Sequence, residues 1–255
     1  MLEHQQTPHG KRFIFAGGAE GSGTRLLRRV LAAPACCASH GRGIAKLPDH
    51  PDAEPLFRAF EEANARLWDR RLPLPMHEQA REDVHRAAAA LVQSPAFVEC
   101  THFIFKRSFP FGGGDHHRPD LFDVVDLPVE SRIVLIYREP CAATYSTFRR
   151  GFDTDLRRLA LRCAEHLTWL DAQFRAVDPA RVLLVSYPRL CRAPDTELER
   201  LSTFCGLAVS HSDLGETLEP DTDARYRREL PAPQAEWLET FFDARRRSQW
   251  HSLTQ

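Results

Sequence analysis

The sequence predicts an α/β protein with a parallel, doubly wound sheet flanked by helices. Short apolar runs of the kind buried in parallel sheets alternate with stretches of helical apolar spacing. An apolar run near the N-terminus also passes through a glycine-rich turn into a helix. With 255 residues and 43% hydrophobic content, the chain suits a single domain over residues 1–255.

The stretch from Arg12 to Leu31 is predicted to be strand, glycine loop and helix. Its apolar run at residues 13–16 is followed by glycines, and leucines then recur at helical spacing. Glycines let backbone N–H groups turn inward, and the helix adds its positive N-terminal end. The loop is therefore a predicted cradle for phosphate or sulfate, and a glycine-rich turn without a ligand is the plainer alternative.

Two nucleotide-binding classes fit this loop less well. Gly18 and Gly23 have the glycine spacing of a triphosphate loop, but Thr24 and Arg25 follow, where that loop needs Lys and then Ser or Thr. A metal-dependent NTPase is disfavoured for this reason. A dinucleotide-binding fold fits less well still, because no acidic residue ends a second strand about twenty residues further on, where it would bind the ribose.

A helical insertion is expected at about residues 50–95, after a loop at residues 32–51 that is rich in small residues. Apolar residues recur at helical intervals in Asp52–Trp68 and His77–Val92, with the linker RRLPLPMH between them. These two helices separate the first strand from the next by a long excursion. We expect them to form a cap that shapes a substrate pocket.

The remaining elements follow from apolar runs and helical spacing. The expected strands are Ala96–Cys100, His102–Phe105, Arg132–Tyr137 and Arg181–Ser186. The expected helices are Cys141–Arg149, Asp155–Val177, Asp195–Cys205 with Gly206 as its stop, and Gln234–Arg246, a basic helix that covers the sheet. FGGGDHHRPD, from Phe111 to Asp120, is a predicted flexible loop, and its adjacent histidines point apart, which argues against a metal site there.

The composition indicates which classes of binding partner to expect. The formal charge of −1 predicts no general attraction to nucleic acid or to membranes. The seven cysteines are odd in number and lack metal-ligand spacing, so we expect free thiols in a reducing compartment and no bound metal. No apolar signal core and no run of membrane-spanning length is present, and we expect a cytoplasmic protein without membrane insertion.

Arg138 and Ser146 form a second candidate anion site. Arg138 stands where the buried strand ends, and ligands of such sheets bind outside the carboxyl ends of the strands. Ser146 follows about two helical turns later, so its hydroxyl can face the same crevice. An Arg with a nearby hydroxyl suits a phosphate monoester, and the alternative is an Arg paired with a surface carboxylate.

Three motifs in the same order resemble the sulfotransferases that use 3′-phosphoadenosine 5′-phosphosulfate (PAPS). GGAEGSGTRLLRRVL resembles their 5′-phosphosulfate loop, and YREPCAATYS resembles their 3′-phosphate motif. VLLVSYPRLCRAPDTELERLSTFCGL is similar to the strand, tyrosine, helix and FxGL stretch that usually follows. The resemblance implies a P-loop-like α/β fold of the sulfotransferase type.

The resemblance also implies which residues bind the donor. Those for the 5′-phosphosulfate are Gly21, Ser22, Gly23, Thr24 and Arg25. Arg138 and Ser146 would hold the 3′-phosphate, and Tyr187 would lie near the adenine. Family loops commonly carry a basic residue where Gly21 stands, and we expect Arg25 to supply that positive charge instead.

The implied reaction is in-line transfer of a sulfuryl group from PAPS to a hydroxyl or amine of a small-molecule, glycan or lipid acceptor. The product nucleotide is adenosine 3′,5′-bisphosphate (PAP), and no metal is required. A neutral histidine suits the role of base. His102, in ECTHFIF, resembles the family's Thr-His after a strand, although Cys100 replaces the Lys of that motif. His40 stands roughly where other members carry a catalytic Glu, and Glu20 in the loop is a further candidate.

Two other functions remain open at this stage. A kinase-like P-loop protein would bind ATP with magnesium in preference to the bisphosphate. A noncatalytic nucleotide-binding module would bind the nucleotide without transferring a group.

Overall fold

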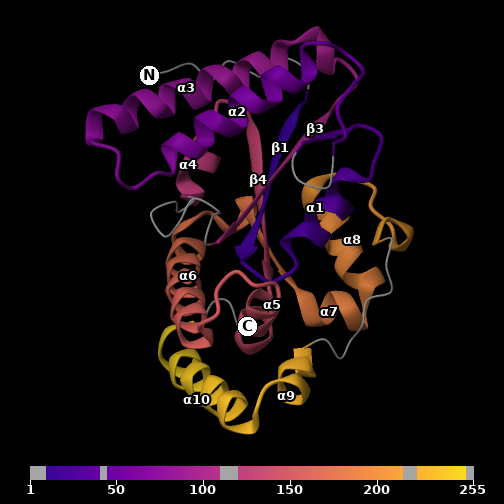
Figure 1. The fold of residues 1–255 in the computed structure, drawn as a ribbon. Coiled ribbons are helices and arrows are strands. Elements are labelled where there is room, and N and C mark those ends of the chain that lie inside the picture. Colours follow the sequence, from indigo (N-terminus) through magenta and orange to yellow (C-terminus); the bar gives the residue numbers. More distant parts are fainter. Residues whose placement is uncertain (1–9, 41–44, 110–119, 215–222, 251–255) are drawn as a thin grey trace.

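The strands form one parallel sheet in the order β2-β3-β1-β4-β5 (Figure 1). The computed structural model describes residues 10–40, 45–109, 120–214 and 223–250. The strands are β1 (Arg12–Ala19), β2 (Cys37–Ser39), β3 (His102–Phe109), β4 (Glu130–Tyr137) and β5 (Val182–Ser186). β1 lies at the centre and is buried from Phe13 to Ala19, as expected for a strand covered on both faces.

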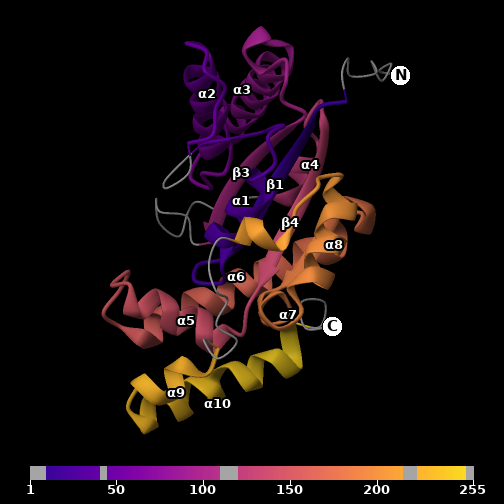
Figure 2. The same cartoon turned by 90° about the vertical axis from the view of Figure 1, so that its right-hand side faces the viewer.

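Helices cover both faces of the sheet, which confirms the predicted doubly wound α/β class (Figure 2). On one face, Ile14 and Ala16 of β1 share a core with α1 (Thr24–Ala32) and α8 (Pro194–Cys205). On the other face, Phe13 and Phe15 share a core with α2 (Ala53–Leu67), α3 (Leu74–Gln93) and α6 (Leu156–Ala176). Successive residues of β1 therefore fill two different cores.

The predicted insertion consists of α2 and α3, which pack against each other and against the sheet. The ring centroid of Phe60 lies 5.3 Å from that of Phe13 and 4.3 Å from that of Phe105. Trp68, directly after α2, meets Phe15 edge-on at 5.5 Å. Aromatic packing thus fixes the insertion on the sheet, and it forms part of the main core.

Short helical elements complete the chain. They are η1 (Pro95–Phe97), α4 (Leu121–Val125), η2 (Pro179–Arg181), α7 (Tyr187–Arg192), η3 (His211–Leu214) and α9 (Arg225–Glu229). Two longer helices are α5 (Pro140–Arg149) and α10 (Ala232–Gln249). Among the described residues, no helix combines the length and apolar character needed to cross a bilayer.

Two sequence predictions near the start of β3 are wrong. Ala96–Cys100 is not a strand: Pro95 begins the 3-10 turn η1, and Ser94 caps it by accepting from the Ala96 N–H. The segment 32–51 is not all loop, since Cys37–Ser39 pairs with β3 as β2. Three residues are too few to give a periodic signal.

α10 also lies elsewhere than expected. It was predicted to cover the sheet, but it packs on α5 and α6, and α6 is the layer that contacts β1. α9 and α10 lie at the end of the molecule opposite α2 and α3 (Figure 1). Most of the predicted loop Phe111–Asp120 lies outside the described residues.

Candidate active site

The glycine loop joins β1 to α1 and its shape requires glycine at two positions. Gly21 and Gly23 have φ angles of +87° and +102°, in the left-handed region that side chains disfavour. A Cβ on Gly21 would overlap the carbonyl oxygen of Ala143 in α5, and one on Gly23 would lie 2.8 Å from the Tyr187 ring. Helices α5 and α7, which follow β4 and β5, therefore lie directly against this loop.

Side-chain hydrogen bonds also hold the loop in place. The buried Ser22 hydroxyl donates to the carbonyl oxygen of Ala19 at 2.6 Å. Thr24, the first residue of α1 and also buried, shares a hydrogen bond of 2.8 Å with Ser108 near the end of β3. Arg25 is exposed at the start of the same helix. The N-terminus of α1 is thereby held at the carboxyl edge of the sheet, where an anion would meet its N–H groups.

Arg138 lies against the glycine loop. It follows β4 directly, is 8% exposed, and donates from Nη1 to the carbonyl oxygen of Gly21 at 3.2 Å. Its Nε donates to Oδ1 of Asp223 at 2.6 Å, and its guanidinium lies 4.5 Å from the centroid of the Tyr187 ring. Arg138, Tyr187 and the loop, which are far apart in the sequence, thus meet at one rim.

α5 touches the same loop. Thr147 donates to the carbonyl oxygens of Glu20 at 3.2 Å and Ala143 at 2.9 Å. Ser146, the predicted partner of the 3′-phosphate, is half-buried next to Thr147 on α5. Glu20 carries a carboxylate in an anion loop, and the structure explains it, because Glu20 pairs with Arg150 at 3.2 Å just past the end of α5.

A cavity of about 420 Å³ adjoins the Arg138–Asp223 pair. It lies among residues of the α5, α7, α9 and α10 region, and its lining mixes both charges. Arg192 and Arg246 contribute positive charge, and Glu139 and Asp223 contribute negative charge. Burial is the main cause that raises the pKa of the Glu139 carboxyl, against the opposing effect of Arg246.

Lys106 is a candidate site residue that was not predicted from the sequence. It lies on β3 two residues before Ser108, so both side chains point to the α1 face of the sheet. Burial lowers the pKa of Lys106 to about 8, assisted by Arg28, Arg25 and Arg107 and opposed by Glu20. A signal existed in the sequence, because the family motif places a Lys two residues before its histidine and Lys106 has that spacing to Ser108. The predicted strand ended at Phe105 and so excluded both.

Arg28 and Arg107 add positive charge beside Lys106. Burial lowers the pKa of both guanidinium groups, and Glu61 of α2 opposes this shift in each. Nη2 of Arg107 donates to the carbonyl oxygen of Glu61 at 3.2 Å. The insertion helix α2 therefore reaches the basic residues next to the loop.

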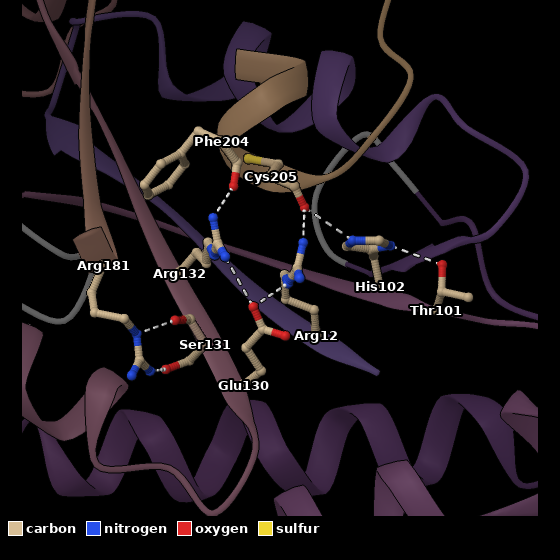
Figure 3. Close-up of polar contacts among 9 residues, drawn as sticks. All are labelled: Arg12, Thr101, His102, Glu130, Ser131, Arg132, Arg181, Phe204 and Cys205. Atoms are coloured by element: carbon tan, nitrogen blue, oxygen red, sulfur yellow. Dashed lines mark hydrogen bonds and ion pairs between the residues drawn. The ribbon is translucent and has the colours of Figure 1, made fainter. Parts of the chain in front are cut away.

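His102, one predicted base, lies at the other end of β3 from the glycine loop. It begins β3 and pairs in register with Arg12 at the start of β1, whereas the loop follows Ala19 at the other end of the strand. An eight-residue strand places these two ends about 23 Å apart. Its ring instead contacts the Thr101 hydroxyl at 2.8 Å and the Cys205 carbonyl at 3.1 Å (Figure 3).

His40 lies nearer to the basic residues. It directly follows β2, and its carbonyl oxygen accepts a hydrogen bond of 3.3 Å from Nη1 of Arg28. Its two ring nitrogens lie 3.7 Å from Oε1 of Glu54 and 3.6 Å from Oε2 of Glu61. Two carboxylates on α2 thus flank this imidazole at the carboxyl end of β2, where Ser39 is in register with Ile104 of β3.

Solved structures share this fold. The sulfotransferase domain of the Synechococcus PCC 7002 olefin synthase is 19% identical with a TM-score of 0.52, covering 93% of this chain and 98% of that domain. The sulfotransferase domain from the curacin biosynthetic pathway is 14% identical with a TM-score of 0.53, covering 93% and 99%. The mouse sulfotransferase SULT7A1, solved in complex with PAP, is 11% identical with a TM-score of 0.52, covering 96% and 87%.

The family comparison extends this likeness to the sequence. No curated protein matches the chain. A family model described as "Sulfotransferase family" matches residues 14–211, from β1 to the start of η3, which spans the glycine loop, Arg138 and Tyr187. On this match, the chain belongs to the sulfotransferase family.

Proposed function

We propose that this enzyme transfers the sulfuryl group of PAPS to a hydroxyl or amine of a small-molecule, glycan or lipid acceptor and releases PAP. The observation that carries the proposal is the hydrogen bond from Arg138 to the Gly21 carbonyl. It brings Arg138, a buried arginine that directly follows β4, to the loop at the N-terminus of α1. Two anion-binding groups on one rim suit a nucleotide that carries phosphates on both the 3′ and the 5′ position of its ribose.

The glycine loop and α1 would hold the 5′-phosphosulfate. The backbone N–H groups of Gly23, the N-cap, and of Thr24 lie at the start of the helix, where its dipole favours negative charge. Lys106 and Arg25 would supply cationic charge beside them, since Arg25 lies near enough to Lys106 to help lower its pKa. Arg25 thus fits the compensating role expected of it, and Lys106 adds a buried partner.

The 3′-phosphate would be bound by Arg138 and Ser146, and the adenine would lie near Tyr187. A guanidinium binds phosphate oxygens through charge-assisted hydrogen bonds, and Tyr187 keeps its plane fixed by stacking at 4.5 Å. Asp223 now accepts from the Nε of Arg138. We expect the 3′-phosphate to compete with this carboxylate for Arg138.

During transfer, negative charge grows on the oxygen that bridges the sulfuryl group and the departing nucleotide. The loop N–H groups and the ammonium of Lys106 would stabilise that charge, because they are fixed before the reaction in a partly desolvated site. Both groups act as hydrogen-bond donors, and neither requires a metal ion.

His40 is the better candidate for the base that accepts the acceptor's proton. Glu54 and Glu61 flank its ring at 3.7 and 3.6 Å and would stabilise the imidazolium formed on proton uptake. The insertion helix α2 therefore supplies both carboxylates and borders the acceptor side, as a cap would. We expect the protein to act in the cytoplasm.

The donor is tested by calorimetric titration with PAP and, separately, with ATP and magnesium. We expect binding of PAP and a higher Tm in its presence. Binding of ATP with magnesium but not of PAP would contradict the proposal and favour a kinase-like protein.

Transfer is tested by incubating the protein with ³⁵S-labelled PAPS and panels of phenols, sugars and fatty alcohols. Label on an acceptor supports the enzyme, whereas PAP binding without transfer to any panel member favours a noncatalytic module. With the accepted compound, His40→Asn should lower kcat by about 100-fold or more, the usual contribution of a general base. His211→Asn, at an exposed histidine of η3, is the matched control and should leave kcat within a few-fold of the wild type.

A further inference from the structure

A cluster of two cysteines and a histidine lies at the end of the sheet away from the glycine loop. Cys37 begins β2 and pairs in register with His102, the first residue of β3, and Cys36 precedes Cys37. The Sγ atoms of both cysteines and one ring nitrogen of His102 all lie within 4.8 Å of one another. Strand pairing creates this cluster, and the linear sequence shows no metal-ligand spacing.

The backbone around the cluster is fixed. The carbonyl oxygen of Cys36 accepts from the N–H groups of Thr101 at 2.9 Å and His102 at 3.3 Å. Lys46 donates to three carbonyl oxygens in the segment that leads to Cys36, those of Ala32, Ala33 and Pro34, at 2.5–2.7 Å. The two cysteines are therefore held against the start of β3 without any contribution from a ligand.

Hydrogen bonds fix the tautomer of the His102 imidazole. A carbonyl oxygen only accepts, so Nε2 must donate to the Cys205 carbonyl at 3.1 Å (Figure 3). Nδ1 of the neutral ring then carries the lone pair, and it now faces the Thr101 hydroxyl at 2.8 Å. Metal-binding histidines commonly show this pattern, in which the second ring nitrogen donates to a backbone carbonyl.

We propose that Cys36, Cys37 and His102 bind one Zn²⁺, with a water molecule as the fourth ligand. Thiolate sulfur and imidazole nitrogen suit zinc, while magnesium and calcium prefer oxygen ligands. In a tetrahedral zinc site, neighbouring ligand atoms lie about 3.5–3.8 Å apart, so each distance in the cluster needs to shorten by about 1.3 Å at most.

Lys46 lies near enough to affect the Cys37 thiol electrostatically, so its positive charge would partly balance the two thiolates. On binding, the two thiols release their protons to solvent, and no oxidation or reduction takes place.

The site would be structural. It joins the edge strand β2 to β3, and it lies about a strand's length from the loop where we expect transfer to occur. β2 has only three residues, so a metal that bridges it to β3 would stabilise the edge of the sheet.

The test is a titration of the full-length, tag-free protein with Co²⁺ under reducing conditions, followed by displacement with Zn²⁺. We expect one Co²⁺ per chain, with thiolate-to-cobalt charge-transfer bands and the visible bands of a tetrahedral site. Cys36→Ser should weaken binding by about 100-fold or more, since even residues that only support metal ligands contribute 10–100-fold. Cys163→Ala, which alters a buried cysteine of α6, is the matched control and should bind normally.

Each outcome decides the proposal. A reduced, folded protein that binds no Co²⁺ or Zn²⁺ would overturn it, as would charge-transfer bands unchanged in both Cys36→Ser and Cys37→Ser. If Cys37→Ser misfolds, the half-buried Cys36 still provides the test, because its variant changes a side chain at the margin of the core.

Discussion

Nη1 of Arg138 lies 3.2 Å from the carbonyl oxygen of Gly21, which joins the end of β4 to the loop that follows β1. Because β1 and β4 are parallel neighbours, both end at the same edge of the sheet. The contact makes the two expected anion sites parts of one structure. A ligand held at one site should therefore affect the geometry of the other.

Arg138→Ala should weaken PAP binding by roughly 1.5–3 kcal/mol, the range for hydrogen bonds to a charged group. The guanidinium is buried and placed at the rim, so its loss removes both charge and donors. Calorimetric titration measures the change, with Arg149→Ala, an exposed arginine of α5, as the control. Equal affinities for wild type and Arg138→Ala would remove Arg138 from the nucleotide site.

Asp223→Asn should tighten PAP binding by about 5-fold, equivalent to about 1 kcal/mol for a partly exposed ion pair. In the wild type, the Asp223 carboxylate already accepts from Nε of Arg138 at 2.6 Å and repels an incoming phosphate. Calorimetric titration with PAP measures the change in affinity. At high salt, the difference in affinity between the variant and the wild type should become smaller. Weaker binding by the Asn variant would instead mean that Asp223 positions Arg138.

Gly21→Ala should abolish measurable PAP binding and destabilise the fold, because the new Cβ would overlap the Ala143 carbonyl oxygen. Gly151→Ala is a matched control. Its φ of +72° is also left-handed, but no atom lies within 4 Å of the added Cβ. Gly151→Ala should lower the free energy of unfolding by only about 1 kcal/mol, which is the local backbone strain. Thermal unfolding and PAP titration distinguish the two, and equal effects would show that α5 does not restrict the loop.

PAP affinity should fall as the pH rises through about 8, the value to which burial lowers the pKa of Lys106. Below that pH the ammonium is charged and attracts the anion, and above it the free protein must take up a proton to bind. The ligand's phosphates are already ionised there, since their second pKa is about 6.

The measurement is a titration series between about pH 6.5 and 9.5, in which affinity should fall by up to tenfold per unit above the pKa. Lys106→Arg should flatten the profile, because arginine stays charged throughout. An identical slope in both proteins would assign the pH dependence to another group.

Much of the fold could be predicted from the sequence because its signals are local. Buried strands such as β4, and amphipathic helices such as α6, carry their periodicity within a few turns. The residues at the ends of strands, Arg138 and the glycines after β1, could be identified as site residues for the same reason. β2 was missed since its three residues are defined only by pairing with β3.

The pairing register of β3 with its neighbouring strands could not be predicted from the sequence alone. Whether β3 ended at Phe105 or at Phe109 decided which residues face the loop, and with it the roles of His102 and Lys106. His102 has a family-like sequence context, yet pairing with Arg12 places it at the far edge, beside Cys36 and Cys37.

The sequence by itself determined the alternation of strands and helices and the chemistry of the glycine loop, because both depend on residues that are close along the chain. Only the tertiary structure decided which residues share an edge of the sheet. That depends on strand pairing over long sequence separations, which brings Arg138 to Gly21 and moves His102 away from both.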